Sequence, residues 1–178
     1  MLTKLKDSWE KLQKSKEYKE FIKKNKDSYL CAGFIIYKSG KEKEANWQID
    51  VYIKETKNIA TFIFEKDKVV VKETNEIFQK VKKDLEELKL GELKIDFKKA
   101  LKIFNKLRDT KYPKEKELDI IVVLQKTGNP CWNITYITTG FNMLHLDIDA
   151  ITGETSNELF EPVMNFSQQV APGPNSIN

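Results

Sequence analysis

The sequence LHLDIDAITGE, residues 144–154, contains the features that decide how the second half of the chain is built. Leu144, Leu146 and Ile148 alternate with polar residues, which is the period-two pattern of a half-buried strand. Thr152 and Gly153 follow as a turn signal, because glycine adopts positive φ values without steric cost. The stretch therefore predicts a strand that ends in a hairpin turn.

The aspartates of this stretch also suggest a calcium loop. Asp147, Asp149 and Glu158 stand at the first, third and twelfth positions of an EF-hand pattern. The pattern fails at the sixth position, where Thr152 replaces the required glycine, and no helix is predicted on either side. We therefore favour the hairpin, in which Asp149 and Thr152 accept local backbone hydrogen bonds.

The composition indicates a globular chain. Of its 178 residues, 40% are hydrophobic and 33% are charged, which is typical of a soluble protein with one domain or two small ones. No apolar run approaches the roughly 20 residues of a membrane helix, and the N-terminal sequence has no apolar signal-peptide core. We therefore expect no membrane span and, by default, a cytoplasmic location; an extracellular one would require that a leader had been removed.

Residues that commonly carry chemistry are few. Cys31 and Cys131 are the only cysteines and His145 is the only histidine. We interpret the cysteines as small buried residues; a disulfide would depend on a Cα separation that the sequence does not give. Two cysteines and one histidine do not supply the four ligands of a structural zinc site, and no nucleophile motif accompanies His145. We expect no catalytic residue, metal or cofactor, and thus no enzyme.

Charge divides the chain into two unequal parts. Residues 1–116 carry a net charge of +10 and residues 117–178 a net charge of −6, and Arg108 is the only arginine. Lysine is a point charge, whereas planar recognition of phosphates and bases relies on arginine. The asymmetry predicts that the acidic part contacts the basic part or a second copy of the chain. Alternatively, it leaves a basic helix face for an acidic partner.

Periodicity predicts two similar series of elements. Apolar residues at helical spacing predict an amphipathic helix over 3–26, a helix over 75–89, and a helix that opens at the N-cap Asp96 and ends before Pro113. Apolar runs and alternating runs predict strands over 29–38, 47–54, 59–65, 69–73, 118–126, 131–139 and 143–150.

A shift of 85 residues superposes the two series without a gap. It places Trp47 on Trp132 and Ile49 on Ile134, and the order of elements agrees. The remaining matches are Ile35 with Ile120, Ile36 with Ile121, Ile59 with Leu144, and Ile63 with Ile148. We interpret the two tryptophans as core anchors; exposed aromatic hot spots on a sheet face are the alternative.

Residues 93–158 resemble the PepSY domain family, a cystatin-like α+β module. The resemblance rests on Ile95-Asp96 and Ala100 at the start of a helix, Trp132 on a later strand, and the ending Asp149-Ala150-Ile151-Thr152-Gly153-Glu154. The first half is similar only through the repeat. The resemblance implies a non-catalytic role, either as a propeptide-like segment that inhibits or chaperones peptidases or as an envelope module that binds proteins.

We predict an α+β fold of two tandem cystatin/PepSY-like units. Each is a helix packed on a three- to four-stranded antiparallel sheet, and an additional helix joins them. Residues 1–90 form the first unit with the connecting helix, residues 91–161 form the second unit, and residues 162–178 form a flexible tail. The sequence leaves open whether strands 29–38 and 118–125 pair into one sheet.

The predicted function is that of a protein-binding module, an inhibitor or regulator of a partner such as a peptidase, acting through a sheet face or edge. A second copy of the chain is a candidate partner. The alternative is a nucleic-acid-associated protein that uses the Lys-rich first half, which the missing arginine cluster disfavours. The candidate binding surface consists of Trp132, Tyr52, Phe62, Phe64, Asp147, Asp149 and His145.

Overall fold

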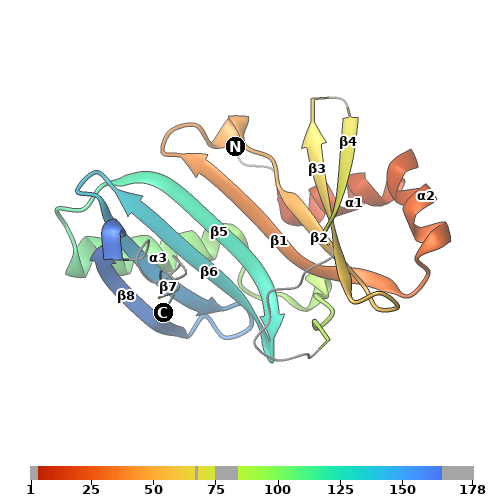
Figure 1. The fold of residues 1–178 in the computed structure, drawn as a ribbon. Helices are drawn as coiled ribbons and strands as arrows, with labels where there is room; N and C mark the ends of the chain where they lie inside the picture. Colours follow the sequence, from red (N-terminus) through yellow and green to blue (C-terminus); the bar gives the residue numbers. More distant parts are fainter. Residues whose placement is uncertain (1–3, 67, 75–83, 166–178) are drawn as a thin grey trace, which may run out of the picture.

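The computed structural model describes residues 4–66, 68–74 and 84–165 (Figure 1). Its helices are α1 (Leu5–Lys14), α2 (Lys16–Lys24) and α3 (Phe97–Lys111), with short 3-10 helices η1 (Glu42–Glu44) and η2 (Leu90–Glu92). Its strands are β1 (Ser28–Lys38), β2 (Gln48–Ile53), β3 (Asn58–Glu65), β4 (Lys68–Thr74), β5 (Glu117–Thr127), β6 (Asn129–Thr138), β7 (Asn142–Asp149) and β8 (Thr155–Pro162).

The strands form one antiparallel sheet in the order β4-β3-β2-β1-β5-β6-β7-β8 (Figure 1). β1 pairs with β5 from Ala32 and Gln125 to Lys38 and Asp119, so the sheet runs without a break through its middle. The strand order is mirrored on the two sides of this central pair. The α+β class that the sequence predicts is confirmed, and strands 29–38 and 118–125, whose pairing the sequence left open, are paired.

The helices cover one face of the sheet, which we call the helix face. Leu5 of α1 lies so close to Gly33 of β1 that a Cβ atom on this glycine would come within 2.6 Å of the leucine Cδ2 atom. Phe104 of α3 lies against Tyr136 of β6, with ring centroids 4.2 Å apart. Alternate residues of the central strands join these contacts in one hydrophobic core. The opposite face, which carries the other alternate residues, is called the open face.

The helix predicted over 3–26 is interrupted at Ser15. Its φ and ψ angles of −69° and 154° are extended, and its hydroxyl accepts a 3.2 Å hydrogen bond from the backbone N–H of Tyr18. Ser15 is therefore the N-cap of α2, a role that serine fulfils well. The predicted periodicity holds on both sides of this residue, but one continuous helix is wrong.

The predicted helix over 75–89 is wrong where the structure can test it. Residues 75–83 lie outside the described residues, and residues 84–89 are not helical. The Leu88 backbone N–H donates a 2.8 Å hydrogen bond to the Leu30 carbonyl, and the Leu88 side chain is buried. The Tyr29 hydroxyl donates a 2.7 Å hydrogen bond to the Leu85 carbonyl. Contacts with β1 therefore satisfy a backbone that the periodicity assigned to a helix.

The remaining predicted elements are present with small changes in their ends. α3 begins after Asp96, whose carboxylate accepts a 2.8 Å hydrogen bond from the Lys99 backbone N–H, as the N-cap prediction requires. β8 lies outside the predicted strands, because TSNELFEP has no apolar alternation. Most of its residues are exposed in the structure. Its pairing with β7 makes it a strand and completes the predicted hairpin.

The gapless repeat is wrong outside β2 and β6. Gly33 pairs with Ile49, and Val122 pairs with Ile134, so the equivalent of Gly33 is Val122 rather than Leu118. β3 and β7 are displaced in the opposite direction. Ile49 pairs with Phe62 and Ile134 pairs with Leu146, so the equivalent of Phe62 is Leu146, whereas the shift of 85 residues gives Asp147. A one-residue slip in a strand exchanges its two faces. The order of elements therefore repeats, while the residue frame does not.

Candidate binding surface

The open face has an apolar patch at its centre, which we call the apolar strip: Phe34 and Ile36 of β1, and Ile121 and Val123 of β5. Ile36 pairs directly with Ile121, and Phe34 with Val123. The Ile36 side chain is 49% exposed, and the other three are partly exposed. An antiparallel sheet with one face in water normally presents polar residues there. The strip is therefore apolar surface that the core of this chain does not account for.

A hydrogen-bonded polar network lies beside the strip on β6, β7 and β8. His145 Nδ1 lies 2.8 Å from Thr135 Oγ1, and His145 Nε2 lies 2.9 Å from Asp147 Oδ1. The side-chain amides of Asn133 and Asn157 donate to the same carboxylate, over 2.5 and 2.7 Å. Because an ionised carboxylate only accepts, a neutral His145 donates from Nε2 and accepts the threonine proton at Nδ1. The network fixes the imidazole between two partners.

Three residues of the predicted binding surface are buried, so the prediction is wrong for them. Trp132 and Phe62 lie on the helix face with 2% and 0% exposure, which confirms a core role for the tryptophan. Tyr52 is on the open face but only 1% exposed, because residues 84–85 cover it. Its hydroxyl donates a 2.9 Å hydrogen bond to Asp84, and burial is the first cause that raises its pKa to about 12.

The other four predicted residues are separated by the two faces. Phe64 is half-buried on the helix face, where the Lys11 ammonium lies 5.3 Å from its ring centroid. His145, Asp147 and Asp149 occupy alternate positions of β7, on the open face. The structure therefore brings together only these three of the seven, next to an apolar strip that was not predicted.

The aspartate stretch is a hairpin, as predicted. Asp149 Oδ1 accepts hydrogen bonds from the backbone N–H groups of Ile151 and Thr152, at 2.7 and 2.9 Å. The bond from Thr152, then a 2.8 Å hydrogen bond from the Asn129 side-chain amide, and after these the bond from Ile151, hold the pKa of Asp149 below its usual value. Gly153 has a φ of 79°. Glu158 is directed to the helix side, where Lys111 and Tyr112 bond to it, so it does not converge with the aspartates on an ion.

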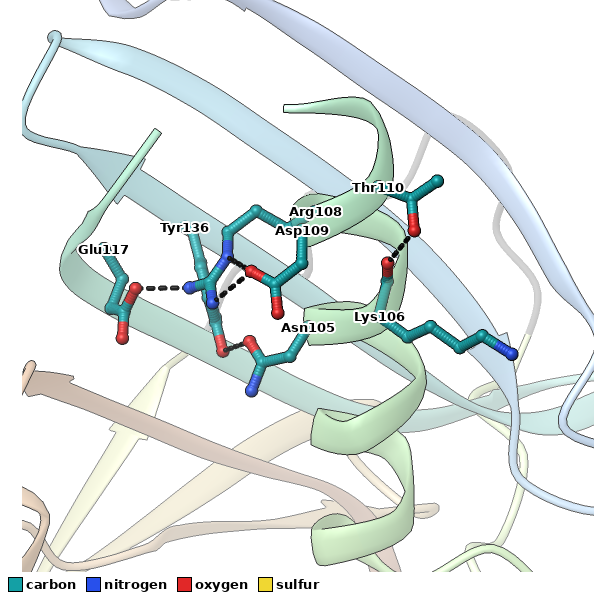
Figure 2. Close-up of polar contacts among 7 residues, drawn as sticks. All are labelled: Asn105, Lys106, Arg108, Asp109, Thr110, Glu117 and Tyr136. Carbon is teal, nitrogen blue, oxygen red and sulfur yellow. Dashed lines mark hydrogen bonds and ion pairs between the residues drawn. The ribbon is translucent and has the colours of Figure 1, made fainter. Parts of the chain in front are cut away.

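The only arginine of the chain is held inside the structure. The Arg108 side chain is 11% exposed and forms an ion pair with Glu117 (Figure 2). It also bonds to Asp109 at 2.9 Å, and its guanidinium carbon lies 5.7 Å from the Tyr136 ring centroid. A surface that reads phosphates or bases through arginine therefore has no arginine to use, which disfavours the nucleic-acid alternative.

The strip has a sequence signal that alternation hides. Phe34-Ile35-Ile36 and Ile120-Ile121-Val122-Val123 are continuous apolar runs. Such runs are typical of strands that are buried on both faces. They predict a covered open face for β1 and β5, whereas the described helices cover only the other face.

The burial of Asp50 on the open face can be tested through the pH dependence of stability. Burial raises the pKa of Asp50 above the usual value, although the 2.7 Å hydrogen bond from Thr61 opposes this shift. The folded state then binds the proton more tightly than the unfolded state, so stability falls as the pH rises through the folded pKa. We expect Asp50→Asn to be more stable than the wild type at about pH 7 and equally stable at about pH 3. Thermal unfolding at both pH values measures this; lower stability at neutral pH would contradict it.

The two cysteines are free thiols and should react slowly. Burial is the main cause that raises the pKa of Cys31 to about 12 and that of Cys131 to about 11. At about pH 8 a thiol with a pKa of about 11 is ionised to roughly one part in a thousand, about a hundredfold less than a free cysteine. We expect both to react with a disulfide reagent at least about 100-fold more slowly in the native protein than in denaturant. Cys131 is only partly buried, so fast labelling of this thiol in the native protein would contradict its raised pKa.

Comparison with known proteins supports the fold alone. No family model and no curated protein sequence matches this chain. The fold is similar to that of the crystal structure of "a putative lipoprotein" from Clostridium difficile 630, with a TM-score of 0.52 and 13% sequence identity. The match covers 82% of this chain and 90% of that one. Among the described residues, no helix has the length and apolar character needed to span a membrane.

Proposed function

We propose that this chain is a non-catalytic protein-binding module and that the open face of its sheet is the binding surface. The apolar strip is the observation that supports this proposal. Apolar side chains that remain exposed in the middle of a sheet are unfavourably hydrated. The free energy falls when another surface covers them. The strip is flanked by hydrogen-bonding side chains on β6 and β7, which resembles an apolar interface centre with a polar rim.

We propose in addition that the fold consists of two similar units. The mirrored strand order and the repeated order of elements support two tandem cystatin/PepSY-like units, over residues 1–90 and 91–161. The first places α1 and α2, and the second places α3, against four antiparallel strands. With the PepSY resemblance of residues 93–158, this arrangement supports an inhibitor or regulator of a partner such as a peptidase.

We also propose a cytoplasmic location for the chain. The sequence favours the cytoplasm, whereas the solved neighbour carries the name of a lipoprotein. Fractionation of source cells with an antibody against the chain tests this directly. Recovery in the envelope fraction would contradict a cytoplasmic location.

Capture of partners with a lysine-reactive crosslinker tests the binding surface. The tagged full chain is added to nuclease-treated source-cell lysate, and its crosslinked lysines are identified by mass spectrometry. We expect crosslinks through the open-face residues Lys38 and Lys72, and loss of the partner on Ile36→Glu. The matched control is Phe141→Glu, because Phe141 is 72% exposed but lies in the β6–β7 turn. A partner that tolerates Ile36→Glu and crosslinks only to α1 and α2 would refute this surface.

A further inference from the structure

We infer that the partner of the open face is a second copy of this chain, which packs on it face to face. The inference rests on the proposed function, because it names the partner of the same surface. It is supported by the extent of the open face, by the distribution of its charges, and by the internal pairing of its polar groups.

The open face is comparable in extent to a standard dimer interface. Neighbouring strands lie about 4.8 Å apart and rise about 3.3 Å per residue, so eight strands of about seven residues span roughly 900 Å². Among the described residues, 84 and 85 cover the part of this area over Tyr52, and the rest is available to a second copy. A stable interface of standard size buries about 800 Å² on each partner. Two sheets also pack face to face with nearly aligned strands in β-sandwiches, about 10 Å apart. The apolar strip then lies at the centre of the contact, where water is excluded.

Charges are distributed unevenly over the open face. By strand alternation, β5–β8 present four acids and no lysine on this face; the acids are Asp119, Asp147, Asp149 and Glu161. Strands β1–β4 present all of its lysines: Lys38, Lys68 and Lys72. The β5–β8 half of the open face, with four acids and no lysine, therefore carries a net charge of −4. The β1–β4 half also presents Asp50 and Glu65, so its three lysines leave it with a net charge of +1.

A twofold axis parallel to the strands makes these charges complementary. It places β1 of one copy over β5 of the other, and likewise β2 over β6, β3 over β7 and β4 over β8. Ile36 then lies over Ile121 of the second copy, and Lys38 lies over Asp119 of the second copy. A twofold axis across the strands would place every strand over itself and set β4 lysines against β4 lysines. Because like charges in contact disfavour association, the charges select the axis parallel to the strands.

The polar network beside the strip can be covered at low cost. Asp147 already accepts hydrogen bonds from Asn133, His145 and Asn157, and His145 also bonds to Thr135. A polar group that keeps its hydrogen bonds avoids most of the penalty of losing water. The network therefore allows β6 and β7 to enter the dimer contact without new partners.

Sedimentation velocity of the purified full chain, from about 1 to 200 μM, tests the dimer. We expect a dimer in the wild type, and a dissociation constant at least about 100-fold higher for Ile36→Glu, which places a charge at the centre of the strip. Phe141→Glu adds the same charge to an exposed apolar residue outside the open face and should leave the dimer unchanged. Because Ile36 is half exposed, its variant should retain the wild-type circular dichroism and melting temperature.

A zero-length crosslinker that joins lysine to carboxylate tests the axis. Lys72 of β4 and the acids Asp149 and Glu161 of β7 and β8 lie at opposite ends of the sheet within one chain. A crosslink between Lys72 and either acid must therefore join two copies. The axis parallel to the strands keeps the register, in which Lys72 is level with Asp149, whereas Glu161 lies six residues further along the strands. We therefore expect a Lys72–Asp149 crosslink in the wild type, its loss in Ile36→Glu, and no Lys72–Glu161 crosslink.

Each other outcome is decisive. A monomer at all concentrations, or a dimer that survives Ile36→Glu, overturns the inference. If the monomer binds a different protein through Lys38 or Lys72, the proposed binding surface stands without the dimer. If the monomer binds no protein through these lysines, both the dimer and the proposed binding surface are refuted.

Discussion

Replacement of Trp132 by alanine is expected to lower the free energy of unfolding by about 3–5 kcal/mol. The indole is 2% exposed and lies against Phe97 and Trp47, with ring centroids 5.5 and 6.3 Å away. Its Nε1–H donates a 2.8 Å hydrogen bond to the Ile95 carbonyl, which the substitution leaves without this partner. Urea denaturation followed by circular dichroism measures the change, with the midpoint and the slope fitted separately.

Two further variants show whether the loss has this origin. Trp132→Phe keeps an aromatic ring in the core and removes the donor, so we expect a smaller loss of about 1–2 kcal/mol. Phe141→Ala removes a ring that is 72% exposed, and its effect should stay within about 0.5 kcal/mol. A Trp132→Ala variant with wild-type stability but weakened partner binding would show that the indole acts at a surface, contrary to its burial.

Alternation predicts seven of the eight strands and separates the two faces of β7, but it does not show which aromatic residues stay exposed. Trp132, Tyr52 and Phe62 all lie on predicted strands, and all three are buried. Trp132 and Phe62 face the helices, and the sequence gives no direct sign of where a helix will dock. Tyr52 faces the other way, but residues 84–85 cover it, and that contact joins distant parts of the chain. Burial therefore depended on tertiary contacts that local periodicity does not contain.

Local capping signals were reliable where the backbone had no competing partner. Asp96 was predicted as an N-cap and starts α3 with a hydrogen bond to the Lys99 backbone N–H. The same reasoning overlooked Ser15, because the apolar periodicity continues across it. It also assigned a helix to residues 84–89, where the Leu88 backbone bonds to Leu30 instead. A long-range hydrogen bond together with burial outweighs the modest propensity of a short helix.

The pairing of the two halves is explained by sequence runs rather than by the repeat. β1 and β5 carry the longest apolar runs and occupy the middle of the sheet, where each has a neighbour on both edges. A central strand needs no charged residues to protect an edge, and such runs would favour aggregation at an exposed edge. The same runs produce the apolar strip, so the fold and the candidate binding surface have a common origin in these two segments.

Arg108→Ala is expected to lower the free energy of unfolding by about 2–3 kcal/mol, because it leaves a partly buried carboxylate without its cation. The Glu117 side chain is 30% exposed, so solvent screening reduces the loss below that of a fully buried pair. The guanidinium also covers the Tyr136 ring, whose hydroxyl donates a 2.9 Å hydrogen bond to Asn105 (Figure 2). Urea denaturation of the variant measures the sum of these contributions.

A double-mutant cycle with Glu117→Ala separates the ion pair from the packing. If the ion pair stabilises the fold, the losses of unfolding free energy in the two single variants should add up to about 1 kcal/mol more than the loss in the double variant. Arg108→Lys keeps the charge but cannot form the planar fork that reaches Glu117 and Asp109 together, so it should recover only part of the stability. Additive losses would show that Arg108 acts by covering Tyr136. In either case a large loss would place the only arginine of the chain in the core, where it cannot also contact an external phosphate.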